Sequence, residues 1–192
     1  MCEVCKMETL RKQAGVTLIE LMTSLSVIAV LLTLSVPSFS DFVTKREIAG
    51  TANLVASFFE TVKMESIKRH EFISVSYKKA ANGPEWCLGA VVGKDTACDC
   101  MSITAECLID SAPMILSNDS YTQFSGMLAG LENGMISYDP IRGVLTDPAA
   151  TATITLQHSE EDYQVKVSIN ATGRVSKCTP ADYKLVGYAT CI

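Results

Sequence analysis

The stretch that decides the fold is Gly15-Val16-Thr17-Leu18-Ile19-Glu20-Leu21, which opens an apolar run that continues to Val36 and stops at Pro37. The run over 16–36 has 21 residues, and a helix needs about 20 apolar residues to cross a bilayer. Glu20 is its one charged residue. Because a carboxylate is costly inside lipid, it indicates a functional site with a partner. We therefore predict a transmembrane segment over residues 16–36 in which Glu20 has a binding role.

The residues before this run indicate the orientation of the chain. Lys6, Arg11 and Lys12 precede it, and positive charge of this kind stays in the cytoplasm. The amino end is therefore expected inside and the body outside, in a single-pass arrangement. A cleaved secretory signal peptide is the alternative, but the residues after the run fit its small-residue cleavage site poorly.

Beyond Pro37 the apolar residues recur at helical spacing, at Ala52, Val55, Ala56, Phe59 and Val62. We predict one helix from about Thr17 to Arg69, with a membrane-spanning first half and an amphipathic second half over residues 37–70.

After Arg69 the pattern changes to alternation, which is typical of strands. The predicted strands are Phe72–Tyr77, Trp86–Val92, Gly134–Tyr138, Val144–Thr146, Thr151–Gln157 and Tyr163–Ile169. The last two flank a polar turn at 158–162 and are predicted to form a hairpin. The fold class is thus α+β, a long amino-terminal helix packed on an antiparallel sheet domain over residues 71–192.

Six of the eight cysteines follow the apolar run, and an even set on one side of a membrane segment indicates disulfides in an oxidising compartment such as the bacterial periplasm. They are Cys87, Cys98, Cys100, Cys107, Cys178 and Cys191. Pairing in sequence order would join Cys87 to Cys98, Cys100 to Cys107 and Cys178 to Cys191. Six cysteines allow about 15 connectivities, so sequence alone does not choose. A zinc site from the first four is the alternative, although paired Cys-x-x-Cys arms are missing.

The charge balance disfavours nucleic-acid binding, and the polar residues favour a non-catalytic protein. Removal of residues 1–15 would leave 13 basic and 19 acidic residues, a balance that disfavours nonspecific binding to nucleic acid. His70 and His158 lie outside any metal-ligand or nucleophile motif and are expected to be solvated. A calcium loop from Asp95, Asp99 and Asp110 is a weaker alternative without regular spacing. We predict neither a cofactor nor a metal site.

The same residues carry a resemblance to a known family. The stretch from Gly15 to Pro37 resembles the prepilin signature of type IV pilins and type II secretion pseudopilins, with glycine before the cut, glutamate fifth after it and proline twenty-second after it. Val16 departs from the usual Phe or Met. The body is similar to the GspH/FimT branch of that superfamily. The segments that carry this similarity are Lys63–Arg69, Trp86–Gly89, Ile136–Pro140 with Gly143, and Ile169–Val175.

The resemblance implies a type IV pilin-like fold and an assembly role. Prepilin peptidase would remove the cytoplasmic leader over residues 1–15 by cutting after Gly15, and Val16 would then be N-methylated. Glu20 would meet the amine of Val16 in a neighbouring subunit, and Pro37 holds a family position in the assembly segment. The expected partners are other pilins or pseudopilins in a helical filament, the peptidase and an inner-membrane assembly platform. The expected location is the bacterial inner membrane, with the body in the periplasm, and then the filament.

Within the family the resemblance implies a minor pilin or pseudopilin that initiates or caps a type IV pilus or a pilus-like filament. A type II secretion pseudopilin of the H type is one alternative. A FimT-like DNA-binding minor pilin is another, because Gly173-Arg174-Val175-Ser176 keeps the first arginine of a Gly-Arg-x-Arg motif and Lys177 follows it. DNA contact through Arg174 and Lys177 is the less favoured prediction, since a solvated strand end accounts for both residues.

Overall fold

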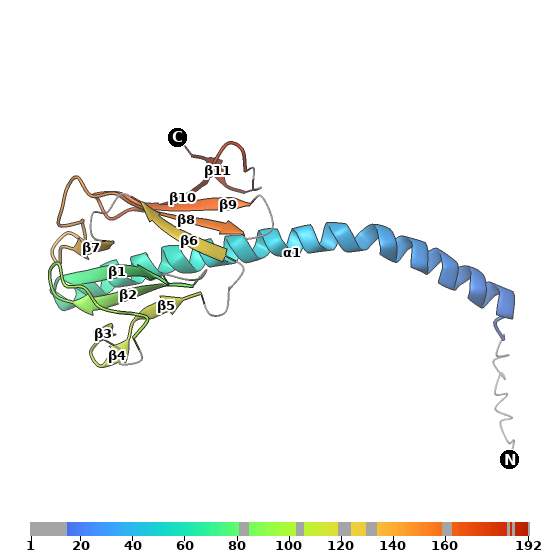
Figure 1. The fold of residues 1–192 in the computed structure, drawn as a ribbon, viewed down its shortest axis with the longest axis horizontal. Helices are drawn as coiled ribbons and strands as arrows, with labels where there is room; N and C mark the ends of the chain where they lie inside the picture. Colours follow the sequence, from blue (N-terminus) through green and yellow to red (C-terminus); the bar gives the residue numbers. More distant parts are fainter. Residues whose placement is uncertain are drawn as a thin grey trace, which may run out of the picture. The chain divides into compact units, whose positions relative to one another are not determined.

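The computed structural model describes residues 15–80, 85–102, 106–118, 124–129, 134–158, 163–183, 185 and 187–191. The chain divides into two compact units, one up to Phe42 and one from Val43 onward. The boundary falls inside the single long helix, α1, which spans Leu18–Arg69 (Figure 1). The predicted helix over 17–69 is confirmed, and its backbone stays helical through Pro37.

The helix ends in a defined capping motif. His70 has a left-handed backbone with φ 57°. Its amide donates to the carbonyl of Ile67, and the amide of Glu71 donates to the carbonyl of Ser66 at 3.3 Å. These are the two bonds of a Schellman motif, which satisfies carbonyls at the end of a helix. The chain therefore reverses sharply at His70 and enters the first strand.

In the part of the chain that the structure describes, no helix has the length and apolar character of a membrane-spanning segment. The transmembrane segment over residues 16–36 stays a prediction.

The second half of α1 buries one face against the sheets of the body. Its fully buried side chains recur every three or four residues, the period of a helix with one apolar face. They are Ile48, Ala52, Val55, Phe59 and Val62. Burial of a large apolar side chain contributes about 1.5–3 kcal/mol, so this face joins α1 to the core and confirms the predicted amphipathic half.

The first sheet has the strand order β5-β2-β1-β7, all antiparallel. Its strands are β1 (Ile73–Lys79), β2 (Trp86–Val92), β5 (Ile115–Ser117) and β7 (Met135–Tyr138). A short hairpin of β3 (Leu108–Ile109) and β4 (Ala112–Pro113) precedes β5. Its two turn residues, Asp110 and Ser111, both have positive φ, as a two-residue hairpin turn requires.

The second sheet has the strand order β11-β10-β9-β8-β6. Its strands are β6 (Phe124–Ala129), β8 (Ala152–His158), β9 (Gln164–Ile169), β10 (Val175–Thr179) and β11 (Ala189–Thr190). Only β10 and β11 run parallel. The predicted hairpin is confirmed, because β8 and β9 pair antiparallel from Ala152 opposite Ile169 to Gln157 opposite Gln164.

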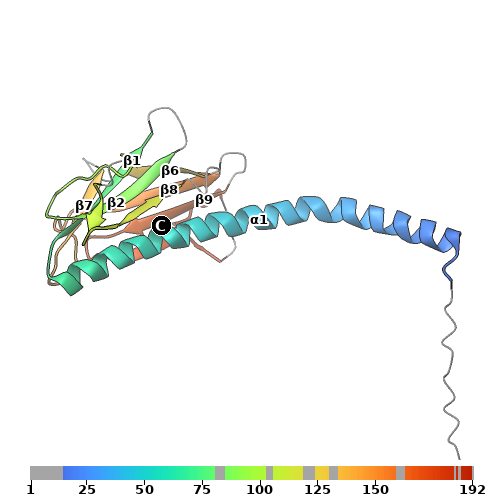
Figure 2. The ribbon, with the colours of Figure 1, turned by 90° about the horizontal axis from the view of Figure 1, so that it is seen from below.

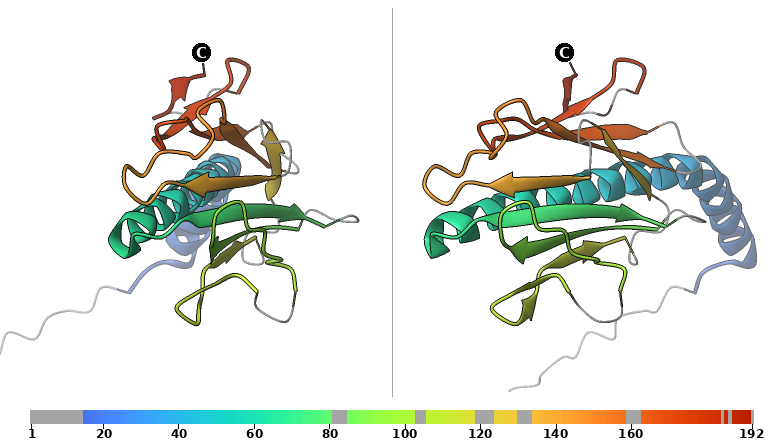
Figure 3. Two further views of the ribbon diagram at one scale, coloured as in Figure 1. Left: turned by 90° about the vertical axis from the view of Figure 1, so that its left-hand side faces the viewer. Right: turned by 60° about the vertical axis from the view of Figure 1, so that its left-hand side comes forward.

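Both sheets lie on the same side of the second half of α1, as Figures 2 and 3 show. The core between them is continuous, and Trp86, Tyr138, Ile154 and Ile169 are among its fully buried side chains. Two polar contacts also fasten α1 to the second sheet. The ammonium of Lys45 lies 5.2 Å from the ring centre of Tyr163, and Lys177 of β10 donates a hydrogen bond to Asn53.

The outer face of the first sheet is covered by a loop that serine hydroxyls hold in place. Ser137 of β7 accepts from the amide of Asp95 at 3.0 Å. On β1, Ser74 accepts from Thr96 and Ser76 from Cys98, both at 3.2 Å. The three serines are buried. Each accepts a hydrogen bond from an amide of the covering segment, so all three buried hydroxyls have a partner.

Five of the six predicted strands are present, with bounds that match or differ by one or two residues. Val144–Thr146 forms only an isolated bridge between Leu145 and Tyr138, so its prediction as a strand is wrong. Its neighbours Gly143 and Asp147 both lie in turns, which leaves too little chain for a ladder.

Candidate functional site

The amino end of α1 places a carboxylate among exposed apolar side chains. The hydroxyl of Thr17 accepts the amide hydrogen of Glu20 at 3.3 Å, and Thr-x-x-Glu is the pattern of a helix capping box. Glu20 therefore lies in the first turn, where the helix dipole favours negative charge. Val16, Leu18 and Ile19 beside it are 68%, 78% and 68% exposed. The stretch from Val16 to Leu21 therefore presents an apolar surface with one acidic group.

Gly15 has no structural reason to be glycine. It lies before the helix, and a Cβ added there would meet no atom within 4 Å. Any requirement for glycine at this position would therefore come from a protein that binds the segment.

Four hydroxyl groups of the apolar run donate to carbonyls of their own helix. Ser24 donates to the carbonyl of Glu20 at 2.8 Å, and Thr23 donates to the same carbonyl at 3.0 Å. Ser26 and Thr33 each donate to the carbonyl three residues earlier at 2.8 Å. Such bonds let hydroxyl side chains lie in apolar surroundings without an unpaired donor.

In the body, two turns meet on the side chain of Lys63. Its ammonium donates to the carbonyls of Thr172 and Gly173 at 3.4 and 3.2 Å. A Cβ on Gly143 would lie 2.8 Å from Cε of Lys63, and a Cβ on Gly173 would lie 2.3 Å from the carbonyl oxygen of Gly143. Both glycines have positive φ, 64° and 68°, so the packing and the backbone both require them.

The first of these turns presents an apolar side chain and a cation on a rigid frame. One carboxylate oxygen of Asp139 accepts the amides of Ile141 and Arg142, each at 2.9 Å. These two bonds lower the pKa of the Asp139 carboxyl. Ile141 is 80% exposed, and Arg142 is exposed beside it.

The six cysteines form three disulfides, two of which cross in sequence. Cys87 joins Cys100, Cys98 joins Cys107, and Cys178 joins Cys191. Pairing in sequence order is therefore wrong for the first four and right for the last two. The crossing arises because the loop folds back over the outer face of β2, where Cys87 and Gly89 point the same way. In this structure the sulfur atoms of the zinc alternative are bonded to one another.

Two family models match the chain. The prokaryotic N-terminal methylation motif matches residues 10–36. The model of the type II transport protein GspH matches residues 51–173, which is more than half of the chain. The chain belongs to the GspH family.

Two solved structures resemble the fold of this GspH-family protein. Both are crystal forms of the type IV minor pilin FimU of Pseudomonas aeruginosa strain PAO1. One has 15% identity and a TM-score of 0.49, and covers 77% of this chain and 98% of its own. The other has 17% identity and a TM-score of 0.47, and covers 69% and 97%. No curated protein matches the chain. The family membership rests on the family models alone.

Three of the four segments that carry the similarity to the GspH branch meet around Lys63. The segment Lys63–Arg69 supplies the lysine, Ile136–Pro140 with Gly143 supplies the first turn, and Ile169–Val175 supplies the second. Leu145 also donates from its amide to the carbonyl of Ala171 at 2.9 Å. These three segments therefore build one structural junction between α1 and the two sheets.

Arg174 and Lys177 do not form one basic patch. Lys177 lies opposite Val167 in the β9–β10 ladder, and its ammonium bonds Asn53 on α1. Arg174 directly precedes β10, in the turn that Asn170 closes. The predicted pair of DNA contacts is thus divided between this turn and the face of β10 that packs toward α1.

His158 and the proposed calcium ligands have different surroundings from those expected. His158 is only 6% exposed, in β8, so its prediction as a solvated turn residue is wrong. The calcium alternative is not assembled: Asp95 bonds Ser137, Asp99 bonds the amide of Met101, and Asp110 pairs with Arg69. Over the described residues, no group of three or more His, Cys, Asp or Glu side chains could hold a metal ion.

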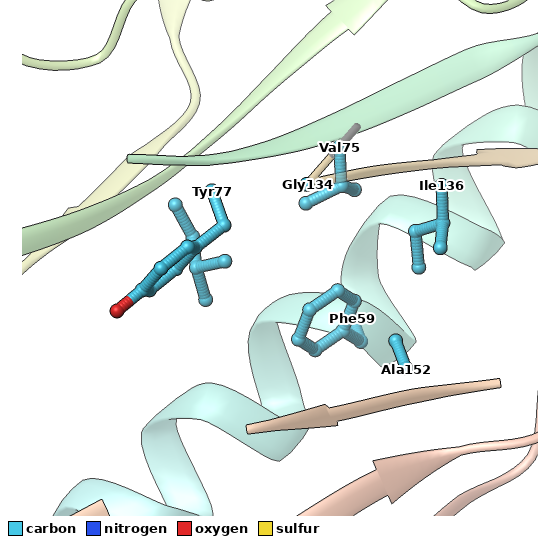
Figure 4. A pocket seen from close by; sticks show the side chains of 7 residues that line it. Phe59, Val75, Tyr77, Gly134, Ile136 and Ala152 are labelled. Atoms are coloured by element: carbon cyan, nitrogen blue, oxygen red, sulfur yellow. The ribbon is translucent and has the colours of Figure 1, made fainter. Parts of the chain in front are cut away.

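One pocket of the body is apolar throughout. It lies between α1, β1, β2, β7 and β8 and is lined by Phe59, Val75, Tyr77, Leu88, Gly134, Ile136 and Ala152. Figure 4 shows the Tyr77 hydroxyl directed away from Phe59 and Ile136, and burial raises the pKa of that hydroxyl to about 12. This lining offers a substrate no acid, base or nucleophile at neutral pH.

Sequence reasoning missed the ion cluster at the end of α1. Arg69 pairs with Glu65 at 2.7 Å and with Asp110 in the β3–β4 turn, and Lys68 pairs with Glu65 at 3.3 Å. The contact with Asp110 joins the disulfide-bonded region to the helix. Only the charge spacing of Glu65 and Arg69 was visible in sequence, because Asp110 lies 41 residues away from Arg69.

Stability of the body should fall at acidic pH because of this cluster. Hydrogen bonds from Arg69 lower the pKa of Asp110 and of Glu65, and Lys68 adds to the effect on Glu65. A lowered carboxyl pKa adds stability above its ordinary value, and that stability is lost as pH falls through the lowered value. Urea unfolding between about pH 6 and pH 2 should show that Asp110→Asn loses less unfolding free energy than the wild type does. Asp182→Asn, at an exposed position, should lose as much as the wild type. The same dependence of unfolding free energy on pH in all three proteins would contradict the role of Asp110.

Lys63→Met should destabilise the junction while keeping the aliphatic stem. The change removes the two hydrogen bonds that the ammonium donates to the carbonyls of Thr172 and Gly173. We therefore expect a loss of about 1–2 kcal/mol in unfolding free energy. Urea titration measures the loss. Lys68→Met, on the exposed side of the same helix, should change stability by less than about 0.5 kcal/mol. Equal effects of the two substitutions would refute a special role for Lys63.

Proposed function

We propose that this chain is a minor pilin or pseudopilin, a non-catalytic subunit that initiates or caps a type IV pilus or a pilus-like filament. The observation that carries the proposal is the methylation motif over residues 10–36 in the same chain as a GspH body over residues 51–173. The exposed Glu20 among exposed apolar side chains supports it, because such a surface needs a partner to cover it.

The proposed assembly chemistry uses the new amino end. Cleavage between Gly15 and Val16 would free an amine four residues before Glu20, and N-methylation would keep that amine cationic. The carboxylate of an incoming subunit would pair with the Val16 amine of its neighbour. In apolar surroundings this attraction is strong, although desolvation of both charges opposes it. Head-to-tail contacts of one kind generate an open helical filament.

Before assembly, the segment 16–36 would anchor the chain in the inner membrane. Lys6, Arg11 and Lys12 in the leader would keep the amino end in the cytoplasm. The three disulfides of the body suit the oxidising periplasm. The back-bonded hydroxyls of Ser24, Ser26 and Thr33 lower the cost of placing this segment in lipid or among other helices.

Gene deletion distinguishes the proposed role from its two alternatives. We expect the deletion strain to lose surface filaments and to regain them with the wild-type gene. Loss of exported enzymes with filaments intact would assign the chain to type II secretion. Loss of DNA uptake with filaments intact would assign it to DNA binding, for which the separation of Arg174 from Lys177 on β10 gives no support.

A further inference from the structure

The outer face of β8, β9 and β10 differs from the rest of the body. The inward residues of these strands are buried, and Ile154, Leu156, Val165, Val167 and Ile169 are 0% exposed. Apart from Cys178, which is disulfide-bonded to Cys191, the outward residues are polar. The outer hydroxyl face is our name for Thr153, Thr155, Lys166, Ser168 and Ser176 of these strands together with Arg174, which directly precedes β10.

The charge of this face is opposite to that of the whole protein. The formal net charge of the chain is −5, yet β8, β9 and β10 contain no Asp or Glu. Lys166 lies at the centre of the face, opposite Thr155 on β8 and Cys178 on β10. Arg174 directly precedes β10. The face therefore has two cations, one in its strands and one beside them, and the three strands contain no carboxylate.

The hydroxyls of the face retain bonding capacity. Thr153 and Ser168 share one hydrogen bond at 3.1 Å, and Ser176 donates to the carbonyl of Ser168 at 3.3 Å. A hydroxyl has one donor and two acceptor positions. These side chains can therefore still accept hydrogen bonds from a molecule laid across them.

On the first sheet, hydroxyls on the outer side bind the backbone of a covering segment. There Ser74, Ser76 and Ser137 lie on the outer side and accept the amides of the segment 95–98 at 3.0–3.2 Å. That segment belongs to the same chain and begins at a turn, where Asp95 has φ 52°. In the second sheet the equivalent side of β8–β10 has the same kind of side chains, and no described segment bonds to it in this way.

We propose that the outer hydroxyl face binds an extended, acidic polypeptide segment of a partner protein. The segment would donate its amides to the Thr and Ser hydroxyls, and its carboxylates would meet Lys166 and Arg174. The three strands contain no Phe, Tyr or Trp. Single-stranded nucleic acids bind largely by stacking on such rings, so a polypeptide is favoured. The face belongs to the body alone, and binding does not depend on filament entry.

Fluorescence anisotropy with the full chain in detergent micelles tests the proposal. The probe is a fluorescein-labelled peptide of alternating Glu and Thr, and a Lys-Thr peptide of equal length is its control. The test variant is Lys166→Glu with Arg174→Glu. Lys78→Glu with Lys79→Glu changes the charge equally on exposed positions of β1. Thr155→Val removes one hydroxyl without changing charge.

We expect the acidic peptide to bind the wild type, and the Lys166/Arg174 variant to lose roughly tenfold in affinity. The Lys78/Lys79 variant should stay within about twofold, and Thr155→Val should weaken binding by about twofold or more. Circular dichroism and disulfide mapping verify that each variant is folded. Absence of binding, equal binding of the Lys-Thr peptide, or unchanged binding by the Lys166/Arg174 variant would overturn the proposal. So would tighter binding of oligothymidylate or polygalacturonate than of the acidic peptide.

Discussion

Glu20→Ala is expected to reduce incorporation of the chain into filaments by at least about tenfold. Removing one partner of a desolvated ion pair costs about 3–5 kcal/mol, because the other charge is left unpaired. In the proposed filament the unpaired group would be the amine of Val16 in the neighbouring subunit. Glu20→Gln should behave alike, since it preserves the shape and removes the charge. Immunoblots of sheared filaments, normalised to the amount of chain in the membrane, measure the effect.

Glu47→Ala is the matched control, because it removes an exposed carboxylate from the same helix. It should enter filaments as the wild type does. If Glu20→Ala were incorporated at the level of Glu47→Ala, the proposed charge pairing would be wrong.

Gly89→Ala is expected to destabilise the body strongly for a substitution that adds a single methyl group. The new Cβ would lie 2.2 Å from the sulfur of Cys107 and 3.0 Å from Cβ of Cys100. Both belong to the crossed disulfides, which cannot move without distorting the loop or the strand. Overpacking of a rigid site typically costs about 1–3 kcal/mol, and we expect the upper end of that range together with incorrect disulfide pairing. Urea unfolding and mass spectrometry of linked peptides measure both effects.

Gly50→Ala is the control for this prediction. Gly50 is exposed on α1, and an added Cβ there meets nothing within 4 Å. Alanine in a helix is favoured over glycine by up to about 1 kcal/mol, so this variant should be at least as stable as the wild type. A Gly89→Ala protein as stable as Gly50→Ala would show that the loop accommodates the methyl group.

Sequence predicted the elements whose side chains repeat with a clear period. The spacing of Val55, Phe59 and Val62 predicted the helix, and the alternation in Thr151–Gln157 predicted β8. Strand β10, Val-Ser-Lys-Cys-Thr, was missed because the polar Lys177 lies on its inner face and breaks the alternation. Hairpin β3–β4 was missed because strands of two residues have no period to detect.

The assembly segment was predictable because its residues are adjacent in the chain, with Glu20 at a fixed spacing from Gly15. The junction at Lys63 was not, because Lys63 bonds carbonyls 109 and 110 residues away. The crossed disulfides were hidden for a related reason. Cys87 reaches Cys100 only because the intervening chain is held over the outer face of the first sheet by Ser74 and Ser76.

The intact mass of the chain recovered from sheared filaments tests the central claim most directly. The account predicts a species that begins at Val16 and carries one methyl group on its amine, with six cysteines oxidised in three disulfides. A Gly15 substitution should leave the leader attached and keep the chain out of the filament. Recovery of chains that still begin at Met1, or absence of the wild-type chain from filaments that form normally, would contradict the account.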